Sequence, residues 1–165
     1  MIDLLITLLQ RFNVISPDLI HSKLFDEDTF YKQFVADLKN CKKVVIIESP
    51  YITTQRMCTL KRHFEALVSR KVKVYIITRN PYDHDISMQK QAEVEIRNFE
   101  MMGVQILINN DYNHRKVAIL DRKILWEGSL NILSQTYSRE LMRRISSKSL
   151  ANNMFRFLKL GKYIY

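Results

Sequence analysis

The amino-acid sequence predicts an α/β fold in which a mixed, mainly parallel β-sheet is sandwiched between helices. Short apolar segments of strand length alternate with segments of helical periodicity through the first two thirds of the chain. Two later apolar segments are separated by only two residues, so they are expected to pair as an antiparallel hairpin. Hydrophobic residues make up 47% and charged residues 26% of the 165 residues, which excludes a disordered or collagen-like chain.

The first half of the chain is expected to alternate between helix and strand. Apolar side chains recur at helical spacing in residues 1–12, which begin a predicted helical extension over residues 1–25. The elements expected after it are helix 28–38, strand 42–48, helix 57–69, strand 72–78, helix 86–102 and strand 104–108. Strands that are joined by helices in this way should lie parallel in one sheet.

The second half of the chain predicts antiparallel strands and a closing helix. Residues 116–121 and 124–127 form the expected hairpin, and residues 141–145 a last strand. A helix over residues 150–160 should pack on the sheet with its apolar side chains inward, namely Leu150, Met154, Phe157 and Leu158. No linker or repeat divides the sequence, so residues 1–165 are expected to form a single domain.

The basic charge is concentrated in the last third of the chain. The formal net charge is +9, and residues 114–165 hold 11 Lys and Arg against 3 Asp and Glu. This asymmetry points to an anionic partner, either a nucleic acid backbone or an acidic membrane surface. The plain alternative is a charged surface that serves only solubility.

One motif in this basic segment carries chemistry. It reads HxKx4Dx6GSxN, and its fixed positions are His114, Lys116, Asp121, Gly128, Ser129 and Asn131. Residues two apart in a strand share a face, so the imidazole and the ammonium group should project together. The Ser129 hydroxyl and the Asn131 amide can donate hydrogen bonds to phosphate oxygens. Such a set could hold a phosphodiester without a metal ion or cofactor, and none is expected.

The motif resembles the HKD motif of the phospholipase D superfamily, and a looser similarity extends from about Asp28 to the C-terminus. The resemblance implies a phospholipase D-like α/β/α fold, with His114 as the nucleophile and Lys116, Ser129 and Asn131 on the phosphate. In the nuclease branch a Glu after the GSxN segment orients the histidine, and Glu140 has that position. Asp121 belongs to the motif and is a further catalytic candidate, although its distance along the strand favours a structural role.

Larger members of that superfamily carry two motifs in one chain, whereas this chain has one. The other histidines, His21, His63 and His84, have no Lys two residues later. The resemblance to the small single-motif branch therefore implies a homodimer in which two copies share one site. One His114 would attack phosphorus to give a phosphohistidine, and the other would protonate the leaving oxygen.

The expected function is a metal-independent phosphodiesterase, a nuclease that cleaves DNA or RNA, with DNA expected over RNA as its nucleic acid partner. Arg115, Arg139 and Arg143 flank the motif and are candidates for binding the nucleic acid backbone. Two alternatives stay open: a phospholipase or phosphatidyl transferase, and a nucleic-acid-binding module without turnover. The sequence has no apolar run of transmembrane length, no signal-peptide pattern and only two cysteines, so a cytoplasmic protein is expected.

Overall fold

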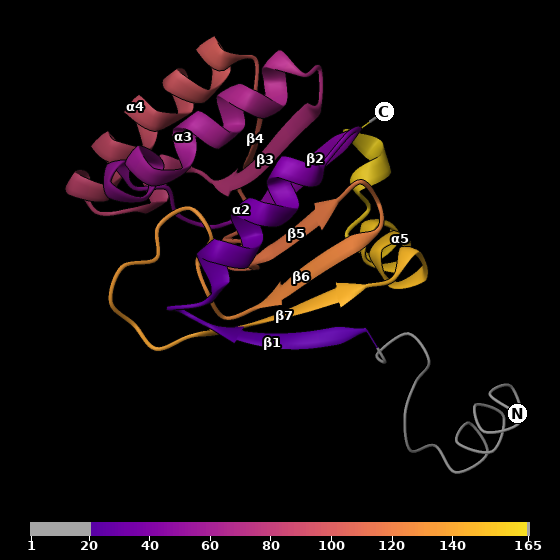
Figure 1. Ribbon diagram of the computed structural model, residues 1–165. Helices are drawn as coiled ribbons and strands as arrows, with labels where there is room; N and C mark the ends of the chain where they lie inside the picture. The colour runs from indigo at the N-terminus through magenta and orange to yellow at the C-terminus, as the bar shows by residue number, and fades with distance from the viewer. Residues whose placement is uncertain (1–20, 165) are drawn as a thin grey trace, which may run out of the picture.

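A seven-stranded β-sheet runs through the part of the chain that the computed structural model describes, residues 21–164 (Figure 1). Its strands are β1 (Ser22–Asp26), β2 (Val44–Glu48), β3 (Lys73–Arg79), β4 (Gln105–Asn109), β5 (Val117–Leu120), β6 (Ile124–Gly128) and β7 (Leu141–Ser146). The helices are α2 (Phe30–Asn40), α3 (Thr54–Ser69), α4 (Ile86–Met102) and α5 (Lys148–Phe157), with short 3₁₀ helices at Pro81–Asp83 and Leu160–Lys162. The strand order is β1-β7-β6-β5-β2-β3-β4.

The sheet is mixed, as predicted, but antiparallel pairings outnumber parallel ones among the described strands. Strands β2, β3 and β4 are parallel neighbours connected by α3 and α4. Strand β5 lies antiparallel to β2, and β6, β7 and β1 continue in antiparallel pairs. The expectation of a mainly parallel sheet is therefore wrong, because β5 inserts beside β2 in the reverse direction and β1 adds one more antiparallel pair.

Strand β1 was not expected, since all its residues but the last belong to the predicted helical extension 1–25. Ser22 to Asp26 instead pair antiparallel with β7 and form an edge of the sheet. The strand is short, and the side chain of Leu24 is 64% exposed. The sequence of this edge strand therefore does not show the alternation of apolar and polar residues by which a strand is recognised. The remainder of the expected extension, residues 1–20, lies outside the described residues.

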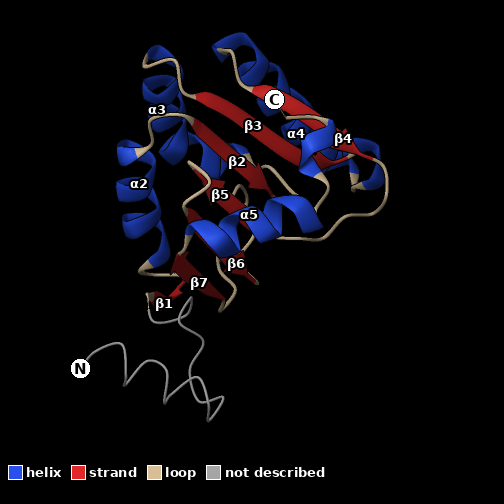
Figure 2. Cartoon of the chain, turned by 90° about the vertical axis from the view of Figure 1, so that its right-hand side faces the viewer, coloured by secondary structure: helices blue, strands red, loops and turns tan. Residues whose placement is uncertain are grey.

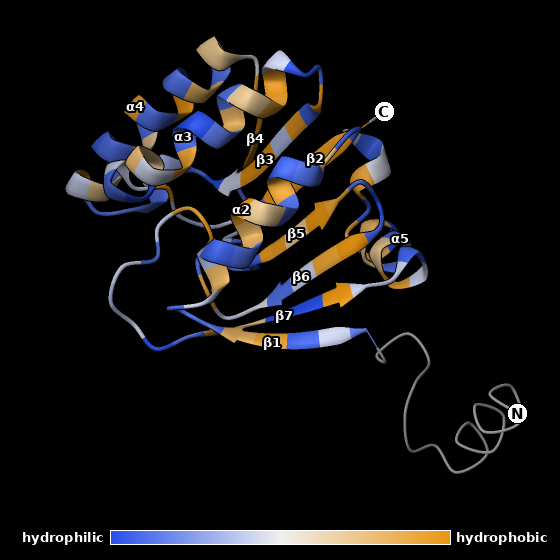
Figure 3. Ribbon diagram, viewed as in Figure 1, coloured by the Kyte–Doolittle hydropathy of each residue, from blue (hydrophilic) through white to orange (hydrophobic). Residues whose placement is uncertain are grey.

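Helices cover both faces of the sheet, and each face has its own apolar core. Helices α2, α3 and α4 pack on one face, whereas α5 covers part of the other (Figure 2). The first core includes Trp126, Phe30 and Phe34, and the second includes Ile119, Ile46 and Phe155. Figure 3 shows β5 mostly in hydrophobic colours, while α3 and α4 alternate between the two ends of the scale. Among residues 21–164, no helix combines the length and the hydropathy that a membrane span requires.

Helix α5 differs from the prediction in one residue that matters for the site. The helix buries Ala151 and Phe155, and Leu158, directly after its end, is buried too. Phe157 was also expected to face inward. It is instead the last residue of the helix, and its side chain is 78% exposed. The apolar run near the C-terminus is thus not entirely a core-facing stripe.

The register of the strands gathers several strand ends at one edge of the sheet. Val117, the first residue of β5, pairs with Glu48 at the end of β2 and with Glu127 near the end of β6. His114 comes shortly before β5, and Glu140 comes directly before β7. Residues from three separate segments of the motif region therefore meet at this edge.

Candidate active site

His114 and Lys116 form a close pair at this edge. The Lys116 Nζ atom lies 2.5 Å from Nδ1 and 3.3 Å from Nε2 of the His114 ring, and 2.6 Å from the His114 carbonyl oxygen. The His114 side chain is exposed, whereas Lys116 is only 8% exposed. An ammonium group can only donate, so Nδ1 accepts and a neutral imidazole then carries its proton on Nε2. The predicted juxtaposition of base and cation is thus present in the fold.

The environment favours the neutral form of the His114 imidazole. Partial desolvation lowers its pKa below the usual value, and the positive charges of Lys116 and Arg79 lower it further. Desolvation also lowers the pKa of Lys116, while the carboxylate of Glu140 acts in the opposite direction. A neutral imidazole beside a cation combines a nucleophile with a group that can bind a phosphoryl oxygen.

Gly128 and Ser129 connect the end of β6 to the site. A Cβ atom at Gly128 would lie 2.2 Å from the Leu141 carbonyl oxygen, so only glycine fits this close approach of β6 and β7. Ser129 is fixed by two hydrogen bonds to Leu141: its N–H donates to the carbonyl oxygen (3.0 Å), and its Oγ accepts from the N–H (3.1 Å). The Ser129 hydroxyl proton stays available for a ligand.

Asn131 begins a tight turn next to Ser129. Its carbonyl oxygen accepts hydrogen bonds from the backbone N–H groups of Ser134 (3.0 Å) and Gln135 (2.8 Å). The Oδ1 atom of its side chain is buried without a hydrogen-bond partner among the described residues. A buried polar atom without a partner is unusual. Oδ1 can only accept a hydrogen bond, so the group of this amide that could donate to a phosphate oxygen is Nδ2.

Glu140 lies in the site but does not contact His114 as the sequence analysis expected. Its Oε1 accepts a hydrogen bond from Ser138 Oγ (2.7 Å), and its backbone N–H donates to Glu27 Oε2 (2.9 Å). The negative charge of Glu140 acts on Lys116, whose pKa it raises. Among the described residues, no carboxylate accepts a hydrogen bond from the His114 ring, whose hydrogen-bonding neighbour is Lys116.

Asp121 lies at the opposite end of β5 from His114, so its place among the catalytic candidates is a misassignment. Its carboxylate accepts hydrogen bonds from three consecutive backbone N–H groups at the start of β2: Lys42 (2.8 Å), Lys43 (2.8 Å) and Val44 (2.9 Å). Its own N–H donates to the Val44 carbonyl oxygen (2.8 Å). Asp121 therefore anchors β2 to the β5–β6 turn, the structural role that its distance from His114 favoured.

The three arginines predicted to bind nucleic acid have different environments. Arg115 forms an ion pair with buried Glu48, with 2.8 Å between its terminal nitrogen and Oε1, although half of its side chain stays exposed. Asn113 donates a hydrogen bond to the same carboxylate oxygen, and the other oxygen of Glu48 has no partner among the described residues. Arg139 is exposed in the loop before β7, and Arg143 is half-buried in β7. Arg115 thus has a structural partner that its sequence position did not indicate.

Two aromatic rings adjoin His114. The Tyr51 ring lies edge-on to the His114 ring, with 5.9 Å between centroids, and also packs on His84 at 4.9 Å. Both ring nitrogens of His84 are buried without a hydrogen-bond partner in the described part of the chain. The packing of the loops after β2 and β3 reveals that Tyr51 borders the site.

The motif residues other than Asp121 line a cavity of about 620 Å³. It is lined by His114, Lys116, Ser129, Asn131 and Glu140, together with Arg115 and side chains of α5. The volume is in the range of small-ligand sites. A nucleophile, a fixed cation, a hydroxyl and an amide around one cavity can bind a phosphodiester and attack its phosphorus atom.

Comparisons with known proteins bear on the family and the fold of the chain. The family model described as cardiolipin synthase, PLD-like domain, matches residues 34–159. The structure of Nuc from Salmonella typhimurium, a phospholipase D family member, resembles this fold with a TM-score of 0.70 at 14% identity, over 84% of this chain and 91% of that chain. For NucT from Helicobacter pylori the TM-score is 0.66 at 18% identity, over 84% and 92%.

A larger protein shares the same fold over part of its length. Phosphatidylserine synthase from Haemophilus influenzae gives a TM-score of 0.67 at 15% identity, and the match covers 86% of this chain but 38% of that one. No curated protein sequence matches this chain significantly. At these identities the likeness to the solved structures concerns the fold.

Proposed function

Because the chain belongs to the phospholipase D-like family, we propose that it is a metal-independent phosphodiesterase that cleaves nucleic acid, with DNA favoured over RNA. The observation that carries the proposal is the Lys116–His114 pair in a cavity that also exposes the Ser129 hydroxyl and the Asn131 amide. The net charge of +9, most of it in the segment that holds this site, supports a polyanionic substrate.

The proposed reaction has two steps. A ring nitrogen of His114 attacks phosphorus, the bond to the leaving oxygen breaks, and a second histidine protonates that oxygen. Water then attacks the phosphohistidine, the second histidine takes up its proton, and the bond to His114 breaks. Lys116 and Asn131 hold the phosphoryl oxygens in both steps. A bound phosphoryl oxygen draws the Lys116 ammonium from the imidazole, which frees the ring for attack.

The second histidine is proposed to come from another copy of the chain. The described part of the chain brings one histidine–lysine pair to the cavity, and no second acid–base histidine lines it. Light scattering should then give about twice the 19.7 kDa chain mass. In a mixed dimer of wild-type and His114→Ala subunits a shared site predicts loss of activity, whereas independent sites would retain about half.

Cleavage in the absence of metal tests the proposed function. Purified protein should nick plasmid DNA or degrade a labelled oligonucleotide in excess EDTA, and His114→Ala should abolish this. His63→Ala serves as the matched control, because His63 is a histidine on α3 outside the cavity. Binding without cleavage would favour a nucleic-acid-binding module, and a strict need for added divalent metal would contradict the mechanism.

Phosphatidyl transfer is a second candidate, and one observation favours it. An apolar cavity of about 440 Å³, lined by Leu125, Ile145, Leu150 and Met154, adjoins the catalytic cavity and could take an acyl chain. The family model and one structural relative also bear the names of lipid-synthesising enzymes. Release of glycerol from phosphatidylglycerol vesicles in EDTA, with no cleavage of oligonucleotides, would establish this candidate in place of the nuclease.

We propose that the protein is cytoplasmic. Cys41 and Cys58 are both free, and Cys58 is exposed, which is the state that a reducing compartment maintains. Fractionation of the source cells with immunodetection tests this, and recovery from an oxidising compartment would contradict it.

A further inference from the structure

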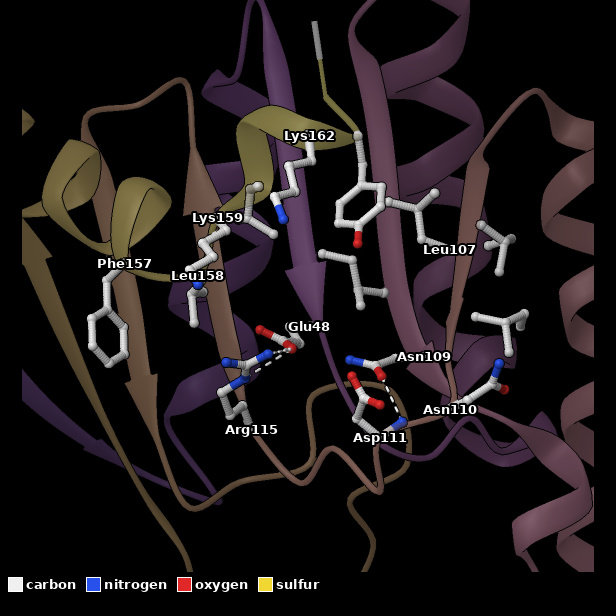
Figure 4. A pocket seen from close by; sticks show the side chains of 15 residues that line it. Glu48, Leu107, Asn109, Asn110, Asp111, Arg115, Phe157, Leu158, Lys159 and Lys162 are labelled. Atoms are coloured by element: carbon white, nitrogen blue, oxygen red, sulfur yellow. Dashed lines mark hydrogen bonds and ion pairs between the residues drawn. The ribbon is translucent and has the colours of Figure 1, made fainter.

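A second cavity, of about 650 Å³, continues from the catalytic cavity (Figure 4). The two cavities share Arg115, Phe157 and Leu158 as lining residues. The far side of the second cavity is formed by the end of β4, which contributes Asn109, and by the segment after α5. A ligand with its reactive phosphate at His114 can therefore extend past Phe157 from the catalytic cavity into the second cavity.

Phe157 occupies the junction of the two cavities. Its side chain is 78% exposed, although residues of its kind are usually buried. It ends α5, and neighbouring Phe155 supplies the aromatic ring that the core uses. Sequence reasoning placed Phe157 in the core, and its exposure beside the catalytic cavity leaves a free aromatic face next to the reacting group. Aromatic faces of this kind stack on nucleic acid bases.

Two lysines follow Phe157 along the second cavity. Figure 4 shows Lys159 and Lys162 on the segment after α5, on the same side of the view as the ion pair of Arg115 with Glu48. Neither ammonium group has a hydrogen-bond or ion-pair partner among the described residues, whereas the charge of Arg115 is partly neutralised by Glu48. The lysines are thus the free cations of this cavity.

Lys159 has a left-handed backbone conformation directly after the end of α5. Its φ is 54° and its ψ 32°, a left-handed conformation that disfavours side chains other than Asn, Asp or Gly. A left-handed residue is common after a helix end, and it holds the segment with Lys162 and Tyr163 against the second cavity. Tyr163, 58% exposed, adds a second aromatic ring beyond Lys162.

We propose that this surface, here called the Phe157–Lys162 groove, binds single-stranded nucleic acid beside the reacting phosphodiester. Phe157 stacks on the base next to the reacting phosphate, and Lys159 and Lys162 bind the next phosphate along the strand. The inference rests on the proposed nuclease function and specifies its substrate class. In a duplex each base is stacked on its neighbours and faces its partner, so its face is not available to Phe157.

Binding measurements on variants test the groove. Fluorescence anisotropy in EDTA, in a His114→Ala background that cannot turn over, compares a labelled 12-nucleotide single strand with a duplex of the same sequence. The groove predicts tighter binding of the single strand. Phe157→Ala should weaken single-strand binding by roughly tenfold and leave duplex binding unchanged. Lys159→Asn, which tolerates the left-handed backbone, and Lys162→Gln should each lower the slope of log K against log salt by about 0.7.

Matched controls separate the groove from general surface effects. Met101→Ala removes an equally exposed apolar side chain on α4, and Lys148→Gln removes an exposed lysine on α5 outside both cavities. Neither should change single-strand binding. Equal affinity for duplex and single strand, or groove variants that behave like the controls, would overturn the inference. Groove variants that weaken binding to phosphatidylglycerol vesicles but not to the oligonucleotide would overturn it in favour of a lipid surface.

Failure of the groove and failure of the proposed function are distinguishable. Bis(p-nitrophenyl) phosphate, a diester without bases or further phosphates, reports on the His114 site alone. If it is cleaved in EDTA and groove variants leave oligonucleotide binding unchanged, only the groove is wrong. If neither this diester nor the oligonucleotide is cleaved, the nuclease proposal itself is wrong, and retained single-strand preference would then support the groove as a binding surface.

Discussion

The Lys116 ammonium group lies 2.5 Å from Nδ1 of His114 and 2.6 Å from the carbonyl oxygen of the same residue. A buried lysine is therefore held against an exposed histidine two positions earlier in the chain. After desolvation, the charge of Lys116 lowers the pKa of the imidazole further, and the contact places a cation where a phosphoryl oxygen can bind. It joins the nucleophile and the phosphate-binding group of the proposed reaction in one unit.

The pKa of His114 predicts the acidic limb of the pH–rate profile. Desolvation first, and the charges of Lys116 and Arg79 next, lower the pKa of the imidazole. The reactive form is deprotonated, so kcat/KM should rise with pH through a pKa below the ordinary value of about 6.5. Lys116→Met removes one of the lowering charges, so the limb should move to higher pH. An unchanged limb in this variant would contradict the electrostatic role of Lys116.

Lys116→Met should also reduce the rate itself. Loss of a preorganised group on a charged transition state costs about 10²- to 10³-fold in kcat. Steady-state kinetics on bis(p-nitrophenyl) phosphate, compared with Lys148→Gln, measure this effect. A rise in KM with unchanged kcat would mean that Lys116 contributes to ground-state binding alone.

Substitution of Asp121 should lower the free energy of unfolding without lowering kcat. Asp121→Ala leaves three backbone N–H groups at the start of β2 without their acceptor, so the free energy of unfolding should fall by about 2–3 kcal/mol. Asp121→Asn keeps one acceptor oxygen and tolerates the φ of 50°, so it should lose less. Denaturant unfolding measures both variants. A large loss of kcat in folded Asp121→Asn would restore Asp121 as a catalytic residue.

Arg115 and Arg139 should respond differently to the same substitution. Arg115→Ala leaves the buried Glu48 carboxylate without its ion pair, so we expect a loss of about 1–3 kcal/mol in the free energy of unfolding. Arg139→Ala removes an exposed charge and should leave stability unchanged while weakening oligonucleotide binding in a salt-dependent way. Equal stability of the two variants would show that the Arg115–Glu48 pair contributes little.

Local sequence patterns were sufficient for much of the fold. The β5–β6 hairpin was predictable because two apolar runs flank a two-residue link, and its turn contains Asp121 and Arg122 with φ values of 50° and 58°. Helix α4 was predictable to the residue because its apolar periodicity ends at Gly103, which adopts the left-handed cap conformation. Strand β1 was not predictable, since an exposed edge strand has no apolar face to reveal it.

The parts of the site that depend on the spacing of residues in the sequence were predictable. The parts that depend on the packing of distant segments were not. His114 and Lys116 come together, as their spacing of two residues predicted, although both lie just before β5 and not in the strand itself. The pairing of Glu48 with Arg115, the separation of Glu140 from His114 and the exposure of Phe157 depend on how distant segments pack. Periodicity placed Phe157 near the inward face of α5, but it cannot tell which residue ends the helix.

The covalent intermediate tests the central claim most directly. An oligonucleotide carrying label at each phosphate is mixed with the protein in excess EDTA, and the reaction is quenched within milliseconds in alkaline detergent, which preserves phosphohistidine. The account predicts label attached to the protein, located on His114 by peptide mass spectrometry, and none on the His114→Ala variant. Cleavage of the oligonucleotide without labelled protein, or label on another residue, would contradict it.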